Sequence, residues 1–252
     1  MVIIGHRGAK EYAPENTILS IKKAIDLGVD YIEFDVHALK DGSLVVMHDD
    51  TLDRTTNGHG FVADKTLDEI KRLDAGMGEH IPTLPEVLDV INKKVKVIIE
   101  ISGFLPVAAC VAKVIEEYVE NKGWKYDDFM VSSFNHPELR ILKDLLPEVK
   151  IGANTSGVPI SYAKFAEELG ADFLATQNLY LTDDKFVKDA HERGIKFYLY
   201  TVNDKAAFQR YENFGIDGIF SDAPDKIAAY STKLNDSISK ELYTDDTNLL
   251  PN

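Results

Sequence analysis

The sequence predicts an α/β protein, because short apolar runs rich in β-branched residues alternate with amphipathic helical stretches over most of its 252 residues. Near-continuously apolar runs of this kind are typical of parallel strands covered by helices. A chain of this length often forms one barrel domain. We therefore predict a (β/α)8 TIM barrel with a small insertion after the second strand. A doubly wound sheet is the alternative, but no Gly-x-Gly-x-x-Gly follows any of the runs.

The strands and helices can be assigned in chain order. Gly28, Gly170 and Gly194 each follow a helical stretch and are typical helix C-terminal stops, while Pro14 and Glu15 suit the first turn of the first helix. The predicted strands are Val2–His6, Tyr31–Ala38, Val95–Ile101, Phe129–Phe134, Lys150–Asn154, Asp172–Thr176, Lys196–Val202 and Gly218–Ser221. The predicted helices are Asn16–Leu27, Leu84–Ile91, Pro106–Asn121, Pro137–Leu145, Tyr162–Leu169, Asp184–Glu192 and Lys205–Phe214.

One segment interrupts the alternation. Residues 50–82 are rich in glycine and threonine and contain a single stretch with a helical face, Leu67–Leu73. We interpret them as the insertion between the second strand and its helix. We expect a single TIM-barrel domain over residues 1–242, which would carry the active site, followed by a polar tail over residues 243–252.

The composition excludes several classes of protein. A net charge of −14 opposes binding to nucleic acid or to an anionic membrane surface. No apolar run reaches the ~18 residues that span a bilayer, and the N-terminus lacks a basic flank followed by a secretory core. We therefore expect a cytoplasmic protein with a small-molecule ligand, no nucleic-acid partner and no membrane insertion.

Two acids and a histidine are expected to meet at the end of the second strand. Glu33 and Asp35 are two residues apart and therefore face the same way, near the strand end where barrel enzymes build their sites. The Asp-Gly pair at 41–42 is typical of a two-residue hairpin turn. In that register His48 lies opposite Asp35, folded over the barrel mouth.

Three further side chains point to the same rim. His6 ends the first strand, and the guanidinium of Arg7 matches phosphate oxygens, although it could equally serve a structural carboxylate such as Glu15. Glu100 stands alone in an apolar strand and should face a cation or a donor, because a buried unpaired carboxylate is costly. Taken singly, each of these residues could be structural. Their convergence indicates a metal-dependent phosphoesterase.

Several motifs form a set that extends from Ile3 to about Pro224. The motifs are His6-Arg7-Gly8, Pro14-Glu15-Asn16-Thr17, Glu33-Phe34-Asp35-Val36, Lys40-Asp41-Gly42, Val46-Met47-His48-Asp49, Arg54-Thr55-Thr56, Ile81-Pro82-Thr83-Leu84, Ser132-Ser133-Phe134, Thr201-Val202-Asn203 and Gly218-Ile219-Phe220-Ser221-Asp222-Ala223-Pro224. Together they resemble the glycerophosphodiester phosphodiesterase family, with the motifs of the first 56 residues the most specific.

The resemblance implies hydrolysis of glycerophosphodiesters to sn-glycerol 3-phosphate and an alcohol, on a barrel with a small insertion after strand two. By motif position, Glu33, Asp35 and Glu100 would hold one divalent cation. Three carboxylates form a hard, oxygen-rich site, which suits Mg²⁺ or Ca²⁺ better than zinc. Glu33 is expected to contact the substrate as well as the cation.

The resemblance also implies the remaining roles. His6 and His48 would be the general acid–base pair, acting through a cyclic phosphate intermediate, and Arg7 would bind the phosphate. The sequence departs from the family where a lysine commonly follows the strand-three glutamate by two residues, because Ser102 stands there. This departure puts one phosphate contact in question.

Two other functions stay open. A lysophospholipase D-like phosphodiesterase on the same barrel would need an apolar groove near the mouth, which Phe61, Met77 and Phe104 could line. A non-catalytic barrel that binds glycerophosphodiesters is the second alternative.

Overall fold

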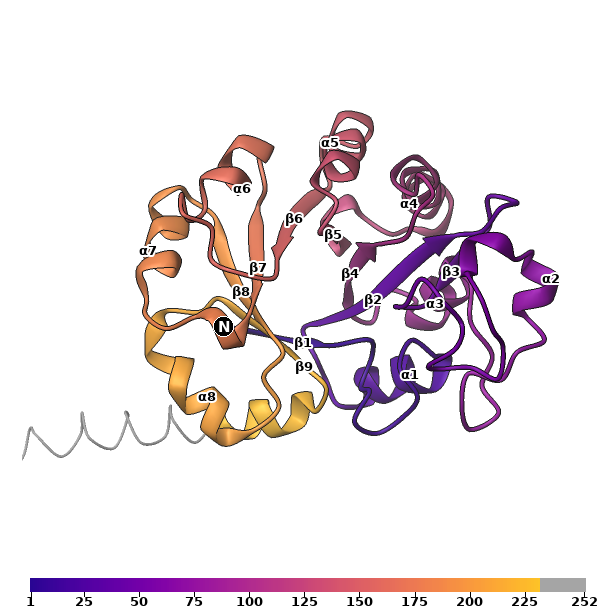
Figure 1. The fold of residues 1–252 in the computed structure, drawn as a ribbon, viewed down its shortest axis with the longest axis horizontal. Coiled ribbons are helices and arrows are strands. Elements are labelled where there is room, and N and C mark those ends of the chain that lie inside the picture. Colours follow the sequence, from indigo (N-terminus) through magenta and orange to yellow (C-terminus); the bar gives the residue numbers. More distant parts are fainter. Residues whose placement is uncertain (232–252) are drawn as a thin grey trace, which may run out of the picture.

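The computed structural model describes residues 1–231 and shows strands arranged around a barrel with helices outside them (Figure 1). The strands are β1 (Val2–Gly5), β2 (Tyr31–Ala38), β3 (Leu44–Val46), β4 (Lys96–Ile101), β5 (Phe129–Ser133), β6 (Lys150–Thr155), β7 (Phe173–Gln177), β8 (Lys196–Tyr200) and β9 (Gly218–Ser221). The helices are α1 (Ile18–Asp26), α2 (Leu67–Ile70), α3 (Leu84–Ile91), α4 (Ala108–Lys122), α5 (His136–Leu145), α6 (Lys164–Leu169), α7 (Lys185–Glu192) and α8 (Lys205–Tyr211). Short 3₁₀ helices lie at Val62–Asp64, Tyr126–Asp128, Asn178–Tyr180 and Glu212–Phe214, and residues 224–231 are helical.

The pairing of the strands closes the barrel. The order in the sheet is β1-β9-β8-β7-β6-β5-β4-β2, all parallel, and β1 also pairs with β2. This confirms the predicted TIM barrel and excludes the doubly wound sheet. In the part of the chain that the structure describes, no helix is long and apolar enough to cross a membrane. The predicted polar tail, and residues 232–242 before it, lie outside the described residues.

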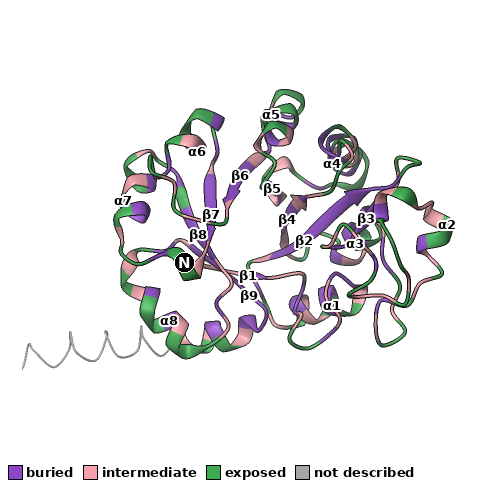
Figure 2. Cartoon of the chain, viewed as in Figure 1, coloured by how far each residue is buried: buried purple, intermediate pink, exposed green. Residues whose placement is uncertain are grey.

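Side chains from alternate strand positions fill the inside of the barrel, and the strands are largely buried (Figure 2). The rings of Phe173 and Tyr198 stack there, with centroids 4.7 Å apart. Gly152 on the neighbouring strand β6 makes room for them, because a Cβ at this position would overlap the Phe173 ring. The interior cluster consists of Ile4, Ile98, Met130, Phe173, Ala175, Tyr198 and Phe220. Apolar side chains therefore fill the interior of the barrel, and the polar inward-facing side chains lie at the carboxyl ends of the strands.

The predicted register of the β2–β3 hairpin is wrong by one residue. Met47, not His48, lies opposite Asp35, and the Met47 N–H donates to the Asp35 carbonyl at 2.9 Å. The turn contains three residues rather than two, and Gly42 in it has a φ of +82°, which glycine adopts readily. His48 still reaches the barrel mouth, because β3 ends at Val46 and the chain turns beyond it.

The predicted insertion has a small core of its own. Residues 47–83 separate β3 from α3, and α2 accounts for only the first part of the predicted stretch Leu67–Leu73. Thr66 caps α2 through its hydroxyl, which accepts from the N–H of Glu69. The cluster that holds the segment consists of Leu39, Val45, Met47, Leu52, Val62, Ile70, Ala75 and Ile81.

The start of α1 also differs from the prediction. The helix begins at Ile18, with Thr17 as its N-cap, so Pro14 and Glu15 do not form its first turn. The Thr17 hydroxyl donates to the Pro14 carbonyl at 2.6 Å and accepts from the N–H of Ser20. Glu15 is therefore free to face the barrel mouth.

The close packing around Gly152 gives a prediction for stability. A Gly152→Ala variant should unfold at lower urea concentration, with a loss of about 1–3 kcal/mol, because the added methyl group must displace the Phe173 ring. A Gly157→Ala variant is the matched control, since nothing lies within 4 Å of a Cβ there. Equal stability of the two variants would show that the barrel interior is not tightly packed at β6.

Candidate active site

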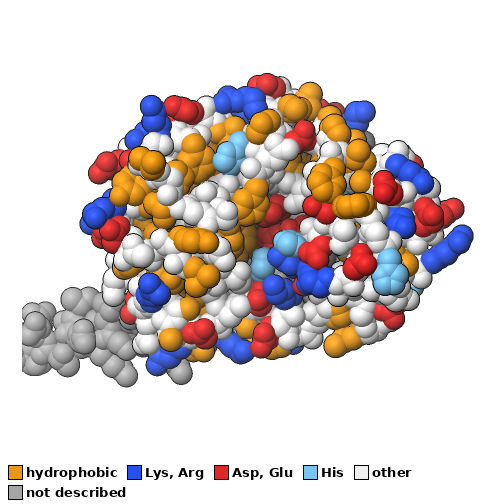
Figure 3. Space-filling view, viewed as in Figure 1, with side chains coloured by type: hydrophobic (Ala, Val, Ile, Leu, Met, Phe, Trp, Pro, Cys, Tyr) orange, Lys and Arg blue, Asp and Glu red, His pale blue; other side chains and the backbone are white. Residues whose placement is uncertain are grey.

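A pocket of about 270 Å³ opens at the carboxyl ends of the barrel strands. Figure 3 shows the hollow, with acidic side chains at its base and histidine and basic side chains on its lower rim. The pocket walls include every side chain that the sequence analysis placed in the site, namely His6, Arg7, Glu33, Asp35, His48 and Glu100.

Three carboxylates meet at the base of this pocket. Glu33 and Asp35 are 1% exposed, and the parallel pairing of β2 with β4 puts Glu100 level with Asp35. One oxygen from each of the three side chains lies within 4.8 Å of the other two. Oxygen ligands in this arrangement can hold a metal ion.

The electrostatics of the cluster are unfavourable without a cation. Burial and the neighbouring Asp35 raise the pKa of Glu100 to about 8. Burial, together with Asp35 and Glu100, raises the pKa of Glu33 well above its usual value. Buried groups of like charge disfavour each other's ionised forms. A bound cation would therefore favour the ionised form of these acids.

Three neutral donors hold the carboxylates in place. Asn16 Nδ2 donates to Asp35 Oδ2 at 2.8 Å, and Asn154 Nδ2 donates to Glu100 Oε2 at the same distance. The backbone N–H of Arg7 donates to Glu33 Oε2 at 2.8 Å. Each of these bonds uses one of the two oxygens of its carboxylate. The second oxygen of each carboxylate is left for a ligand.

His6 is held by a carboxylate that follows β9. Its Nδ1 lies 2.6 Å from Asp222 Oδ1, and Asn203 Nδ2 donates to the other Asp222 oxygen at 2.8 Å. Burial opposes ionisation of Asp222, but the bonds from His6 and Asn203 and the charge of Lys10 keep its pKa below the usual value. An ionised Asp222 can only accept hydrogen bonds, so Nδ1 of His6 must carry the proton between them. Nε2 of His6 can then accept a proton from a ligand. Burial and the nearby Arg7 lower the pKa of His6, despite the opposing effect of Asp222.

His48 is held in the same way from the insertion. Its Nδ1 lies 2.6 Å from Asp49 Oδ1, and Arg54 donates to both Asp49 oxygens, at 2.7 and 2.8 Å. The bond from Arg54, and then that from His48, keeps the pKa of Asp49 well below its usual value. His37, buried on β2, donates from Nε2 to the His48 carbonyl at 3.0 Å. His37 thus helps to fix the position of the His48 backbone.

Arg7 serves a structural carboxylate and also borders the pocket. Its Nη1 donates to Glu15 Oε1 at 2.7 Å, and Arg54 binds both Glu15 oxygens. Burial acts against ionisation of Glu15, but the two arginines outweigh it and lower the pKa to about 2. Arg7 Nε lies 3.5 Å from Asp35 Oδ2 and, among the described residues, has no hydrogen-bond partner. The φ of Arg7 is +52°, and backbone conformations this rare in non-glycine residues cluster at functional sites.

Five residues that complete the site had no role in the sequence analysis. Asn16, Asp49, Arg54 and Asp222 lie within the quoted motifs, but a motif does not show which atoms bond. For Asp222 a signal was available, because a closed barrel puts its last strand beside its first, and His6 directly follows β1. For Asn154 the sequence gives a polar residue at a strand end and nothing more specific.

The fold and the pocket define a TIM barrel with an acid cluster, two carboxylate-paired histidines and an arginine at its carboxyl-terminal mouth. Residues 6–226 match the model of the glycerophosphoryl diester phosphodiesterase family. A glycerophosphodiester phosphodiesterase of Caldanaerobacter subterraneus subsp. tengcongensis is 39% identical over 236 residues, covering 90% of this chain and 96% of that protein. One of Bacillus subtilis is 33% identical, with 89% and 84% covered.

Solved structures agree with the sequence comparison. An Oleispira antarctica phosphodiesterase in complex with the product sn-glycerol-3-phosphate superposes with a TM-score of 0.84 at 33% identity, covering 92% of this chain and 97% of that one. The chain described here therefore belongs to the glycerophosphodiester phosphodiesterase family and is a phosphodiesterase of that family, as the motifs predicted.

The raised pKa values of Glu33 and Glu100 predict that metal binding releases protons. Below about pH 8, Glu100 holds a proton that a divalent cation must displace, so affinity should rise as the pH increases toward that value. Titration calorimetry with Mg²⁺ or Ca²⁺ near pH 7, in two buffers of different protonation enthalpy, measures this release. A Glu100→Gln variant should bind more weakly and release fewer protons. Affinity that does not change with pH would contradict the prediction.

Proposed function

We propose that this protein hydrolyses glycerophosphodiesters to sn-glycerol 3-phosphate and an alcohol, with a divalent cation. The observation that carries the proposal is the pairing of His6 and His48, each through Nδ1 to an aspartate, in the pocket that also contains the acid cluster. The product bound to the Oleispira antarctica relative supports the choice of substrate.

The residues at the base of the pocket fit a divalent cation. Glu33, Asp35 and Glu100 supply carboxylate oxygens alone, which suits Mg²⁺ or Ca²⁺. The raised pKa values of Glu33 and Glu100 show that a positive charge in their midst would be favourable. When bound, such a cation offsets charge that develops on phosphate oxygens and favours ionisation of a nearby hydroxyl. Glu33, which is tied to the backbone of Arg7, would also contact the substrate.

Arg7 and Lys10 bring positive charge to the same pocket. The unpaired Nε of Arg7 is a donor that a phosphate oxygen would satisfy. Because Glu15 and Asp35 already hold the guanidinium, little further ordering is needed when the phosphate binds. Ser102 carries no charge. In this proposal the positive charge that binds the phosphate therefore comes from Arg7, Lys10 and the cation.

The two histidines can transfer the protons of a two-step reaction. One takes the proton of the glycerol hydroxyl adjacent to the phosphate, and that oxygen attacks phosphorus, while the other protonates the departing alcohol. The product of this step is a cyclic glycerol phosphate, which water opens with the histidine roles exchanged. The lowered pKa keeps His6 in the neutral form that accepts a proton. This favours His6 as the first base and His48 as the first acid.

Substitution of either histidine tests the roles. His6→Ala and His48→Ala should each lower kcat by about 10²–10⁴-fold, because each removes one proton transfer, while cation affinity is retained. The matched control is His59→Ala, which removes an exposed imidazole outside the pocket. A His6→Ala variant with full turnover would refute the assignment.

The reaction itself is tested by a coupled assay for sn-glycerol 3-phosphate. EDTA should abolish product release, and Mg²⁺ or Ca²⁺ should restore it. Protein that binds a glycerophosphodiester when loaded with a cation, yet releases no product, would be a non-catalytic binder instead.

The same assay separates the lysophospholipase D-like alternative, which needs an apolar groove. Phe61 and Phe104 are exposed and pack edge to face, with centroids 5.8 Å apart, but neither lines the catalytic pocket. Faster turnover of lysophosphatidylcholine than of glycerophosphocholine would favour that alternative.

A further inference from the structure

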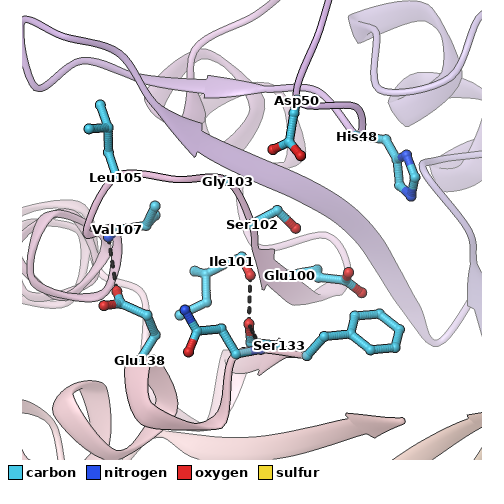
Figure 4. A pocket seen from close by; sticks show the side chains of 12 residues that line it. His48, Asp50, Glu100, Ile101, Ser102, Gly103, Leu105, Val107, Ser133 and Glu138 are labelled. Atoms are coloured by element: carbon cyan, nitrogen blue, oxygen red, sulfur yellow. Dashed lines mark hydrogen bonds between the residues drawn. The ribbon is translucent and has the colours of Figure 1, made fainter. Parts of the chain in front are cut away.

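A second cavity adjoins the catalytic pocket. Its volume is about 260 Å³, and it shares His48, Glu100 and Phe134 with the first pocket. Figure 4 shows Asp50 and His48 along one side, Glu138 on the opposite side, and Ser102 and Glu100 between them. Sites for whole drug-sized ligands typically start at about 300 Å³, so each cavity suits a part of a ligand.

The two cavities differ in charge. The catalytic pocket contains Arg7 and Lys10. The walls of the second cavity, as far as residues 1–231 show, contain neither lysine nor arginine but include the carboxylates of Asp50 and Glu138 in addition to Glu100. A cation bound by the acid cluster would offset Glu100, and the charge of Asp50 and Glu138 would remain.

Asp50 is the carboxylate best placed to meet a ligand. Its side chain is 45% exposed, and Figure 4 shows the carboxylate directed into the cavity. Within the described part of the chain, its one ion-pair contact is with His37 Nδ1, at 3.9 Å. Glu138, by contrast, is engaged at the start of α4, where one of its oxygens accepts from the N–H groups of Val107 and Ala108, at 2.9 and 2.8 Å.

Phe134 adds an aromatic surface between the two cavities. Its ring is half exposed and packs edge to face against Tyr200, with centroids 6.1 Å apart. An aromatic face and a carboxylate that line the same cavity can each attract an ammonium group, the ring through its quadrupole and the carboxylate through its charge.

The geometry of a phosphodiester connects these observations. Its phosphate carries two arms, the glycerol and the esterified alcohol, and both must extend from the same phosphorus. With the phosphate beside Arg7 and the acid cluster, one arm could stay in the catalytic pocket while the other passes His48 into the second cavity, because the two cavities share His48. A neutral glycerol would gain no charge attraction from the acidic walls, whereas a cationic alcohol would.

We propose that the second cavity is the subsite for the leaving alcohol, and that Asp50 and Phe134 make it selective for alcohols bearing an ammonium group, such as ethanolamine or choline. This inference rests on the proposed function, and it extends it from glycerophosphodiesters in general to those with cationic head groups. Asp50 acts here as a specificity residue through its charge alone.

The test compares glycerophosphocholine with its uncharged isostere, the 3,3-dimethylbutyl ester of glycerol 3-phosphate, in which carbon replaces nitrogen. The readout is the ratio of the two kcat/KM values, measured as sn-glycerol 3-phosphate release by the cation-loaded enzyme. An Asp50→Asn variant should lower this ratio by about fivefold, the size of one partly exposed charge interaction. The intrinsic reactivity of the two leaving groups also differs, but that difference is the same in every variant and cancels.

Two further variants control the comparison. Asp50→Glu keeps the charge and should keep most of the preference. Asp68→Asn makes the same charge change on exposed α2 of the same insertion, outside the cavity, and should leave the ratio unchanged. Melting curves of all four proteins verify that each is folded.

The outcomes separate the two proposals. A ratio that is the same in wild type and Asp50→Asn would overturn the subsite while leaving the hydrolase function intact. A ratio that falls equally in Asp68→Asn would also overturn it, because overall charge rather than the cavity would then set the preference. Release of no sn-glycerol 3-phosphate from either ester would overturn the proposed function and the subsite with it.

Discussion

The repulsion among three clustered carboxylates, two of them fully buried, is the constraint on which this site depends. The barrel places Asp35 and Glu100 level on adjacent strands, with Glu33 on the same strand face. Burial and the neighbouring carboxylates raise the pKa of Glu33 and of Glu100. Asn16 and Asn154 hold two of them with neutral donors, which fix their geometry without cancelling their charge. The three side chains therefore form a site that could hold a cation.

A network of alternating charges links this cluster to the two histidines. Arg7 connects Asp35 to Glu15, and Arg54 connects Glu15 to Asp49, which holds His48. The insertion thus orients one histidine. The other is held by Asp222 beyond the last strand. The closed barrel sets β1 beside both β9 and β2, so the residues that follow these strands meet at the same rim.

Much of this could be predicted from the sequence, and the limits have physical causes. All eight barrel strands were located within two residues, because buried parallel strands are continuous apolar runs. The hairpin register was wrong because Asp-Gly suits two-residue and three-residue turns alike, and only packing decides between them. The side chains of the site were found from strand ends and spacing. Their bonding partners, such as Asp222 and Asn154, depend on contacts between residues distant in the chain, which spacing does not encode.

Anomalous diffraction from crystals grown with Mn²⁺ tests the central claim most directly. Mn²⁺ is a redox-silent probe here that accepts the same oxygen ligands as Mg²⁺ and Ca²⁺. The account predicts one strong peak at the barrel mouth, in contact with carboxylate oxygens of Glu33, Asp35 and Glu100. A fully loaded crystal whose peak lies elsewhere, or whose peak touches none of these three side chains, would contradict it.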